Sequence, residues 1–199
     1  MKRLAILILC MLGVFALEAR NIKSLFVDMP DSLMPMLSTN AKKDLIDFYE
    51  SNMRPTLPNE WNTTSQITLI KDNLLCLNED HEGTITTTIA ALSHKGRDTI
   101  VCLVRTIKMP QPDSQISFYT TDWKPLAVKT FINLPTLHDL QYDRKELCII
   151  DYTAITLEPN DAGSPSLRIT VDASDNTVDT QLKQSFLYRW NNTKFIKQP

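Results

Sequence analysis

The side chains best suited to chemistry in this sequence are carboxylates and a histidine that lie close together in one predicted loop. Glu79, Asp80, His81 and Glu82 are consecutive, and carboxylate and imidazole groups are common ligands of calcium and zinc in proteins. Consecutive residues of a short turn seldom converge on one point, and their spacing matches neither a zinc nor an EF-hand pattern. The sequence therefore favours a solvated hairpin turn here, with a metal site as the alternative.

A second acidic group, Asp172, Asp175 and Asp179, could supply oxygen ligands to calcium. It lacks the central glycine and the terminal glutamate of an EF-hand loop, and Asp, Asn and Ser are ordinary turn formers. We therefore expect an exposed loop. A calcium-stabilised structural protein stays open as an alternative, and no metal ligand is assigned.

The third acidic group is Asp44 and Asp47, which are one helical turn apart. General acid–base chemistry needs a carboxyl with a raised pKa and a partner across a cleft, which one helix face does not supply. Asp44 is instead expected in the first turn of a helix, near the positive end of the dipole. A hydrolase of unrecognised type that uses acids such as Asp44, Glu79 or Asp172 stays open as an alternative. Histidines that could join such a site are His81, His94 and His138.

Glycine scarcity removes several enzyme classes from consideration. Phosphate-binding loops, dinucleotide fingerprints and nucleophile elbows require glycines at fixed spacings. Beyond the apolar start of the chain only Gly83, Gly96 and Gly163 occur, each in a predicted turn. No cofactor is expected and no catalytic or cofactor-binding residue is assigned.

The cysteines read as structural residues. Cys10 lies in the apolar start of the chain, and Cys76, Cys102 and Cys148 each sit among apolar residues. No CxxC or Cys/His ligand spacing is present, and free cysteine in such surroundings behaves as a small buried hydrophobe. Three cysteines allow at most one disulfide within the mature chain.

The chain begins with the layout of a secretory signal peptide. Lys2 and Arg3 form a basic start, an apolar run continues to Leu17, and small residues at Ala16 and Ala19 suit cleavage. We therefore expect a signal peptide over residues 1–19 and a periplasmic or secreted location.

Residues 20–199 are expected to form a single domain, because no low-complexity linker divides them and no further apolar run is long enough to span a membrane. The whole chain carries 21 Lys and Arg against 23 Asp and Glu, a net charge of -2. A mildly acidic protein without basic clusters is a poor nucleic-acid binder, so no nucleic-acid partner is expected.

Helical periodicity is confined mainly to residues 29–53. Pro30 suits the first position of a helical turn that Pro35 interrupts, and Ser38 or a neighbour can cap a longer helix to about Asn52. The expected apolar positions are Leu33, Met36 and Leu37, followed by Leu45, Ile46, Phe48, Tyr49 and Met53. The expected polar face consists of Lys42, Lys43, Asp47 and Glu50.

From Gln66 onward the pattern changes to short β-rich runs separated by turn formers, which predicts antiparallel meanders. "DTIVCLVRTI" is apolar on both faces and should be a central strand, whereas "SLRITVD" alternates and should be half-buried. The other expected strands are "QITLI", "NLLCLN", "TITTTIAAL", "SQISFYT", "ELCIIDYTAITLE" and the start of "SFLYRWNNTKFI".

Aromatic residues gather at two predicted hairpins, "ISFYTTDWKPL" and "SFLYRWNNTKFI", which would be equivalent if the chain holds two similar helix-plus-meander halves. Packing over the core is the favoured role for these rings. The alternative is an interaction surface formed by Phe118, Tyr119, Trp123, Tyr188 and Trp190.

The segments "MPDSLMPML", "KDLIDFYE", "TIVCLVRTIKMPQPDSQISFYTTDW" and "FLYRWNNTKF", behind a signal peptide, together resemble a family of secreted Bacteroidales proteins of unknown function. The resemblance covers most of the mature chain and implies an extracytoplasmic location. It implies no active-site residue.

The fold class expected is α+β, a large antiparallel sheet with N-terminal helices packed on one face. The expected function is a non-enzymatic binding or interaction module of the cell envelope, acting on a protein or envelope partner. The alternatives are the hydrolase and the calcium-stabilised structural protein.

Overall fold

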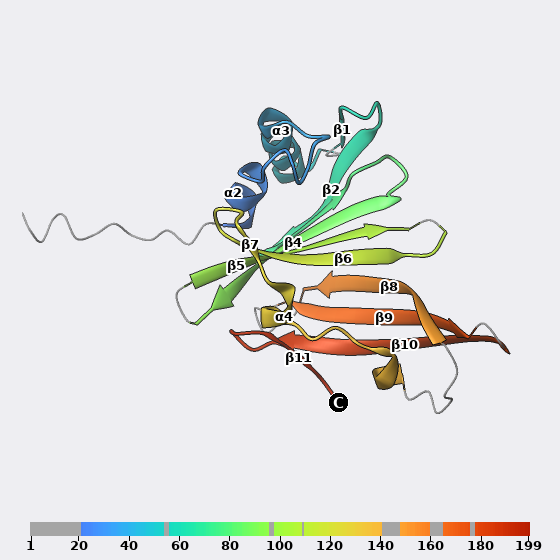
Figure 1. The fold of residues 1–199 in the computed structure, drawn as a ribbon. Helices are drawn as coiled ribbons and strands as arrows, with labels where there is room; N and C mark the ends of the chain where they lie inside the picture. Colours follow the sequence, from blue (N-terminus) through green and yellow to red (C-terminus); the bar gives the residue numbers. More distant parts are fainter. Residues whose placement is uncertain are drawn as a thin grey trace, which may run out of the picture.

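Two antiparallel sheets dominate the protein. The computed structural model describes residues 21–53, 56–95, 98–108, 110–140, 148–159, 165–175 and 178–199. Its strands form one sheet of seven and one sheet of four, each with its strands in chain order, as in a meander. The predicted antiparallel sheet with N-terminal helices is confirmed, in a molecule that is mostly β (Figure 1). The expected signal peptide, residues 1–19, lies outside the described residues.

The elements follow the chain in two successive helix-then-strand groups. The first group is α2 (Ile22–Val27), α3 (Thr39–Glu50), β1 (Thr56–Pro58), β2 (Thr64–Lys71), β3 (Leu74–Asn78), β4 (Ile85–His94), β5 (Asp98–Ile107), β6 (Asp113–Thr120) and β7 (Pro125–Leu126). The second group is α4 (Val128–Phe131), the 3-10 helix η1 (Leu137–Leu140), β8 (Cys148–Glu158), β9 (Ser166–Asp175), β10 (Val178–Trp190) and β11 (Phe195–Lys197). The groups are unequal in size, and a duplication stays a prediction.

The seven-stranded sheet is covered on both faces, as strand β5 shows. Its Val101 and Leu103 belong to the apolar cluster under α2 and α3, whereas Cys102 and Val104 belong to the cluster shared with the four-stranded sheet. Alternating residues of a strand point to opposite faces, so a strand covered on both sides must be apolar throughout. The prediction that "DTIVCLVRTI" is a central strand is confirmed. Figure 1 shows the resulting layers: helices, large sheet, small sheet.

Strand β9 illustrates the simpler pattern of the small sheet. Leu167, Ile169 and Val171 are buried against the large sheet while Arg168 is exposed, as its alternation predicts. At the margin between the sheets the outer edge of β8 is held by side chains of β6. The backbone N–H groups of Thr153 and Ile155 donate to Asp113 Oδ1 (3.1 Å) and Ser114 Oγ (2.9 Å).

The N-terminal segment, residues 25–36, is fixed by donors from distant elements. Four of its backbone carbonyls, spaced three or four residues apart, each accept a hydrogen bond from outside the segment. The pairs are Leu25 with Trp123 Nε1 (3.2 Å), Met29 with Lys42 Nζ (2.6 Å), Leu33 with Arg105 Nη2 (3.0 Å) and Met36 with the Glu60 N–H (3.2 Å). These bonds satisfy backbone groups that no regular ladder reaches.

The sequence located the longer helix well and its surroundings less well. Helix α3 begins after Ser38, whose Oγ accepts from the Ala41 N–H (3.2 Å), as the capping prediction requires. After Pro30 the chain forms hydrogen-bonded turns over residues 31–37, and the Met34 N–H donates to the Pro30 carbonyl (3.3 Å), so the predicted helical turn is present as a single turn that does not extend into a helix. Helix α2 and strand β1 were not predicted.

Three residues in or just after α3, namely Lys42, Asp44 and Met53, do not lie where the sequence predicted. Lys42 is fully buried, because its stem crosses the apolar cluster to reach the Met29 carbonyl, and its ammonium lies 3.7 Å from Asp31 Oδ1. Met53, placed on the apolar face, is 52% exposed, since α3 ends at Glu50. Asp44 is exposed and lies beyond the first turn, so its predicted role near the positive helix end is wrong.

Both predicted aromatic hairpins exist, and the second strand of each is an edge strand of its sheet. β6 pairs with β7 through Phe118 and Leu126, and β10 pairs with β11 through Trp190 and Phe195.

Within the part of the chain that is described, no helix is long and apolar enough to cross a membrane.

Candidate functional site: a lysine-rimmed pocket

The acidic loop at Glu79 is not the uniformly solvated turn that the sequence favours. His81 and Glu82 are exposed, but Glu79 has 0% exposure, so the expectation is wrong for this residue. Its Oε1 accepts from Arg105 Nε (2.9 Å) and from the Thr87 hydroxyl. Arg105 also donates to the Leu33 carbonyl, and this bond links the carboxylate to the N-terminal segment.

The Glu79 carboxylate has one oxygen, Oε2, that is buried and without a hydrogen-bond partner among the described residues. The backbone around it is well anchored, since Asn59 Nδ2 and Ser65 Oγ both donate to the Glu79 carbonyl (2.8 and 3.1 Å). Glu79 does not line either of the two hollows described below. Glu79 is therefore a buried carboxylate whose partner, Arg105, also contacts the N-terminal segment.

The other candidate acids are not brought together. Asp44 lies on α3 and Asp172 on β9, in opposite layers of the molecule, and Glu79 follows β3. Asp172 and Asp175 belong to β9 and Asp179 to β10, so the prediction of an exposed loop is wrong for these three positions, which lie in paired strands. Among the described residues no three His, Cys, Asp or Glu side chains are placed to hold a metal ion.

The histidines lie apart from one another. His81 is exposed, with Nδ1 3.4 Å from the Thr64 hydroxyl. His94 contacts the rings of Phe131 and Trp190, with centroids 5.9 and 6.3 Å away. His138 is exposed on η1, so the histidines and candidate acids that the structure describes do not share a cleft that would support the hydrolase alternative.

Two cysteines occupy the structural positions that the sequence predicts. Cys76 and Cys102 are free thiols, and burial raises the pKa of both, for Cys102 far above its ordinary value. A thiol held protonated in an apolar core is a poor nucleophile and a poor metal ligand. The side chain of Cys148 lies outside the described residues.

The five aromatic candidates mostly pack inward. Phe118, Trp123, Tyr188 and Trp190 are buried, and Tyr119 is half-buried against Trp123 (5.5 Å between centroids). Both tryptophans use their N–H groups to join layers. Trp123 donates to the Leu25 carbonyl and Trp190 donates to the Ser93 carbonyl (2.6 Å). Their placement favours packing over a shared exposed surface.

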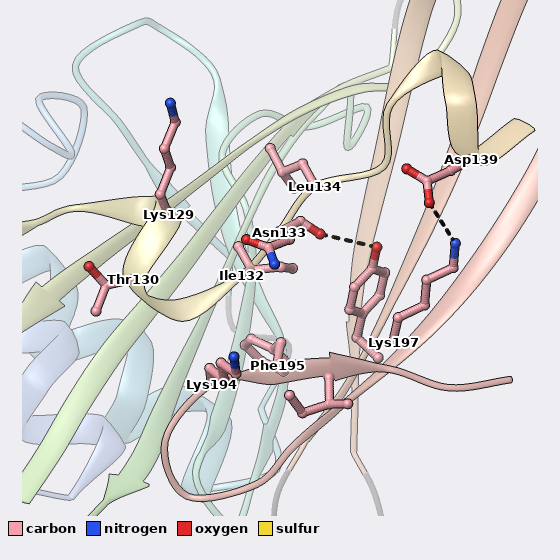
Figure 2. Close-up of a pocket in the computed structure, with 11 residues that line it drawn as sticks. Lys129, Thr130, Ile132, Asn133, Leu134, Asp139, Lys194, Phe195 and Lys197 are labelled. Carbon is pink, nitrogen blue, oxygen red and sulfur yellow. Dashed lines mark hydrogen bonds and ion pairs between the residues drawn. The ribbon is translucent and has the colours of Figure 1, made fainter.

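One hollow lies beside the second hairpin and combines charge with apolar surface. This lysine pocket has a volume of about 350 Å³ and lies between the chain from α4 to Leu134 on one side and β11 with its preceding turn on the other. Three lysines, one carboxylate and two exposed aliphatic side chains give it its character: Lys129, Lys194, Lys197, Asp139, Leu134 and Ile196. Figure 2 shows Lys129 on the α4 side and Lys194 on the hairpin side.

Asp139 and Lys197 form the polar end of the lysine pocket. Lys197 Nζ donates to Asp139 Oδ1 (3.0 Å), and Oδ2 accepts from the N–H and the hydroxyl of Thr136 (2.8 and 2.9 Å) (Figure 2). The Thr136 hydrogen bonds and Lys197 lower the pKa of Asp139 to about 2. Burial, and then the negative charge of Asp139, raise the pKa of Tyr188, which donates to the Asn133 carbonyl (3.2 Å).

Local structure positions the lysine on the hairpin side. Asn191 Oδ1 accepts from the N–H groups of Thr193 and Lys194 (3.0 and 2.8 Å), and Asn192 takes a left-handed conformation (φ 65°). Asn is among the residues that tolerate such turns best, so the turn is well defined. Among the described residues neither Lys194 nor Lys129 has an ion-pair partner.

The lining of the lysine pocket is positive although the chain is acidic. Its three lysines and one aspartate sum to +2, whereas the whole chain carries -2. Since Asp139 is paired with Lys197, the unpaired charge belongs to Lys129 and Lys194. An anionic group is the ligand chemistry that this arrangement attracts.

A second hollow, of about 500 Å³, lies where the two sheets diverge near β8. Its floor is made by Thr86, Thr88 and Thr106 of the large sheet, and Lys108 is its one charged residue. It offers hydroxyl groups without a second charged partner, and it therefore gives a less specific indication of a ligand.

Sequence reasoning missed the lysine pocket except for Tyr188. Its lysines come from distant parts of the sequence. Lys194 follows Lys129 by 65 residues, and Lys197 follows it by 68. They line one hollow because the segment after α4 lies beside the hairpin, where the Tyr188 hydroxyl donates to the Asn133 carbonyl. The available local signal was "NNTKFIK", a turn with two lysines beside an aromatic strand.

Comparisons with known proteins agree with the fold. A family model described as "Protein of unknown function (DUF3256)" matches residues 14–195. A solved structure, "Structure of a domain of an uncharacterized protein from Porphyromonas gingivalis W83", is similar at 21% identity, with a TM-score of 0.67, over 89% of this chain and 97% of that chain. At that identity the likeness shows the fold alone.

No curated protein matches the sequence. The expected link to Bacteroidales proteins of unknown function is supported by the family match and by the Porphyromonas structure, while secretion stays a prediction. Because the family model spans most of the sequence, the chain belongs to DUF3256, a family of proteins of unknown function.

Proposed function

We propose that this protein is a non-enzymatic binding module of the cell envelope, periplasmic or secreted, and that the lysine pocket holds an anionic component of that envelope. The extracytoplasmic location is supported by the basic start and apolar run of the first nineteen residues. The binding role is supported by the geometry of the pocket.

The observation that carries the proposal is the pair of unpaired ammonium groups at one pocket. Lys129 and Lys194 come from different elements and flank the same hollow, while the third lysine is neutralised by Asp139. Ligand sites are typically concave and mostly apolar, with a few convergent polar groups that set specificity. The lysine pocket is concave and places apolar side chains beside charged ones, and the described acids and histidines do not converge on a second charged cleft.

Native mass spectrometry of the protein purified from the envelope fraction of its own cells tests this function. We expect a small organic anion to co-purify in stoichiometric amount. The double variant Lys129→Glu/Lys194→Glu should lose it, because the pocket then repels a negative group.

The matched control is Lys43→Glu/Lys71→Glu, which makes the same charge change at two exposed lysines on α3 and β2, away from the pocket. It should keep the anion. The proposed function is overturned if the wild-type protein carries no anion, or if the pocket variant retains one as well as the control does.

A further inference from the structure

We propose that the ligand of the lysine pocket is amphiphilic: a single-chain organic anion whose carboxylate or phosphate head meets a lysine of the rim, Lys129 or Lys194, and whose hydrocarbon body covers Leu134 and Ile196. This inference rests on the proposed function, and it adds the chemical class of the ligand.

Exposed aliphatic side chains at the pocket are the first support. Leu134 is 42% exposed and Ile196 is 37% exposed, and both line the lysine pocket. Among the described residues only five large apolar side chains are exposed to this degree, so two of the five share one hollow. Exposed apolar surface gathered at a concave site marks a place where apolar ligand atoms can be buried.

The layout of the pocket separates its apolar and charged parts. Buried Ile132 and Phe195 continue the apolar surface toward the core, whereas the two unpaired lysines lie on opposite sides of the hollow, with the Lys129 side chain directed away from Lys194 (Figure 2). A purely ionic ligand would leave Leu134 and Ile196 in water. A purely apolar ligand would leave the two lysines without a counter-charge.

The size of the pocket limits the ligand. Its volume of about 350 Å³ lies at the low end of the range for small-molecule sites, roughly 300–1,000 Å³. A concave site of this size suits one short hydrocarbon chain. It does not suit a flat membrane surface, which would contact the lysines and aliphatic side chains without entering the hollow.

Titration of the purified protein with four probes tests the inference: octanoate, octyl phosphate, inorganic phosphate and octanol. We expect octanoate or octyl phosphate to bind at least about tenfold more tightly than phosphate or octanol, since each buried methylene adds roughly fourfold in affinity. The stronger of the two octyl anions identifies the head group.

Two variants assign the binding to this pocket. Lys129→Glu/Lys194→Glu and Leu134→Ser/Ile196→Ser should each weaken binding of the octyl anion about tenfold or more. The control Ile107→Ser removes an apolar residue that is 49% exposed and does not line the pocket, and it should leave affinity unchanged.

Equal binding of inorganic and octyl phosphate, lost in the lysine variant, would overturn the amphiphilic ligand and leave the proposed anion-binding function standing. Binding of intact anionic phosphatidylglycerol vesicles without binding of either octyl anion would overturn it in favour of membrane docking. Failure of every probe would also overturn it, while the co-purification experiment continues to judge the proposed function.

Discussion

The two faces of the seven-stranded sheet are covered in different ways. On one face lie α2, α3 and the irregular N-terminal segment, and on the other lies a regular four-stranded sheet. The buried polar and charged side chains of the described chain all belong to the first face or its margin: Lys42, Ser65, Glu79 and Thr87. The second face is held by a run of touching rings: Phe118, Phe131, Trp190 and Phe195.

The difference follows from how each cover satisfies its backbone. A sheet pairs most of its N–H and C=O groups internally, so the four-stranded sheet can meet the large sheet mainly through apolar side chains. The N-terminal segment has carbonyls without regular partners, and Lys42, Arg105 and Trp123 bring donors to them. Among the described residues, the buried charges of Lys42 and Glu79 therefore lie beside the irregular N-terminal segment. The charges available to a ligand are those of Lys129 and Lys194 at the lysine pocket.

Trp190→Ala should have the largest effect, because it breaks the contact between the two sheets. Replacing a buried tryptophan by alanine costs about 3–5 kcal/mol of unfolding free energy, and here the hydrogen bond to Ser93 is lost as well. Urea unfolding followed by circular dichroism measures it. Trp61→Ala, at a tryptophan that is 47% exposed, is the control and should cost about 0.5 kcal/mol or less. Equal costs would contradict the packing role.

Glu79→Gln should have the next largest effect, on the helix-covered face. Removing one partner of a fully buried pair costs about 3–5 kcal/mol, and because the Arg105 side chain is 31% exposed we expect roughly 2–3 kcal/mol. The control is Glu158→Gln, which breaks an exposed pair with Arg168 on the small sheet and should cost about 0.5 kcal/mol. Chemical denaturation compares them, and a loss no greater than that of Glu158→Gln would show that the pair does not anchor the N-terminal segment.

The extent to which the sequence predicts this structure depends on the range of the interactions. Strand β5 was predicted because its residues are apolar on both faces, which indicates cover on both sides. Strand β9 was predicted because its apolar and polar residues alternate, which indicates cover on one side. Helix α3 was predicted by its Ser38 cap and its apolar periodicity. These signals are local, and a single segment contains all of them.

The residues that were predicted wrongly depend on partners far along the chain. The sequence pattern places Lys42 on the polar face of its helix, but in the fold Lys42 donates to the Met29 carbonyl. It places Glu79 in a solvated turn, but in the fold Glu79 accepts a hydrogen bond from Arg105 of β5. The lysine pocket is the same kind of feature, since α4 and β11 meet only in the folded molecule. Charge patterns in the sequence therefore drew attention to acidic groups that do not come together among the described residues, and they missed the lysine pocket.

Lys42→Met tests the buried charge on the helix-covered face of the large sheet, because it removes the ammonium group. Burial lowers the pKa of Lys42 below its ordinary value of 10.5, against the opposing effect of Asp31. The unfolded chain therefore binds the proton more tightly, and wild-type stability rises with pH from the lowered pKa up to about 10.5. The variant lacks this rise, so its deficit of about 1 kcal/mol at neutral pH should grow as the pH approaches 10.5.

Urea unfolding at neutral pH and near pH 10.5 measures the Lys42 effect. Lys43→Met, at the exposed neighbour, is the matched control and should follow the pH dependence of the wild type. Parallel pH profiles for Lys42→Met and the wild type would show that the ammonium is not buried in solution.

Asp139→Asn should have the smallest effect on stability, because its pair with Lys197 stands at a rim. The pKa of Asp139 is lowered to about 2 from 3.8, so its stabilisation is present above pH 3.8 and is lost as the pH falls toward 2. The side chain is 34% exposed, and solvent screening keeps the loss below about 1 kcal/mol. Thermal unfolding across that pH range measures it, with exposed Asp44→Asn as control.

The same variant separates structural charge from ligand-binding charge. Asp139→Asn frees the Lys197 ammonium, which raises the charge of the lysine pocket from +2 to +3 without altering its apolar lining. Octanoate should then bind more tightly, by about twofold to fivefold for one additional exposed charge. Weaker binding in Asp139→Asn would mean that the Asp139–Lys197 pair itself shapes the site. In that case the rim pair would have the structural role that Glu79→Gln tests at the buried pair.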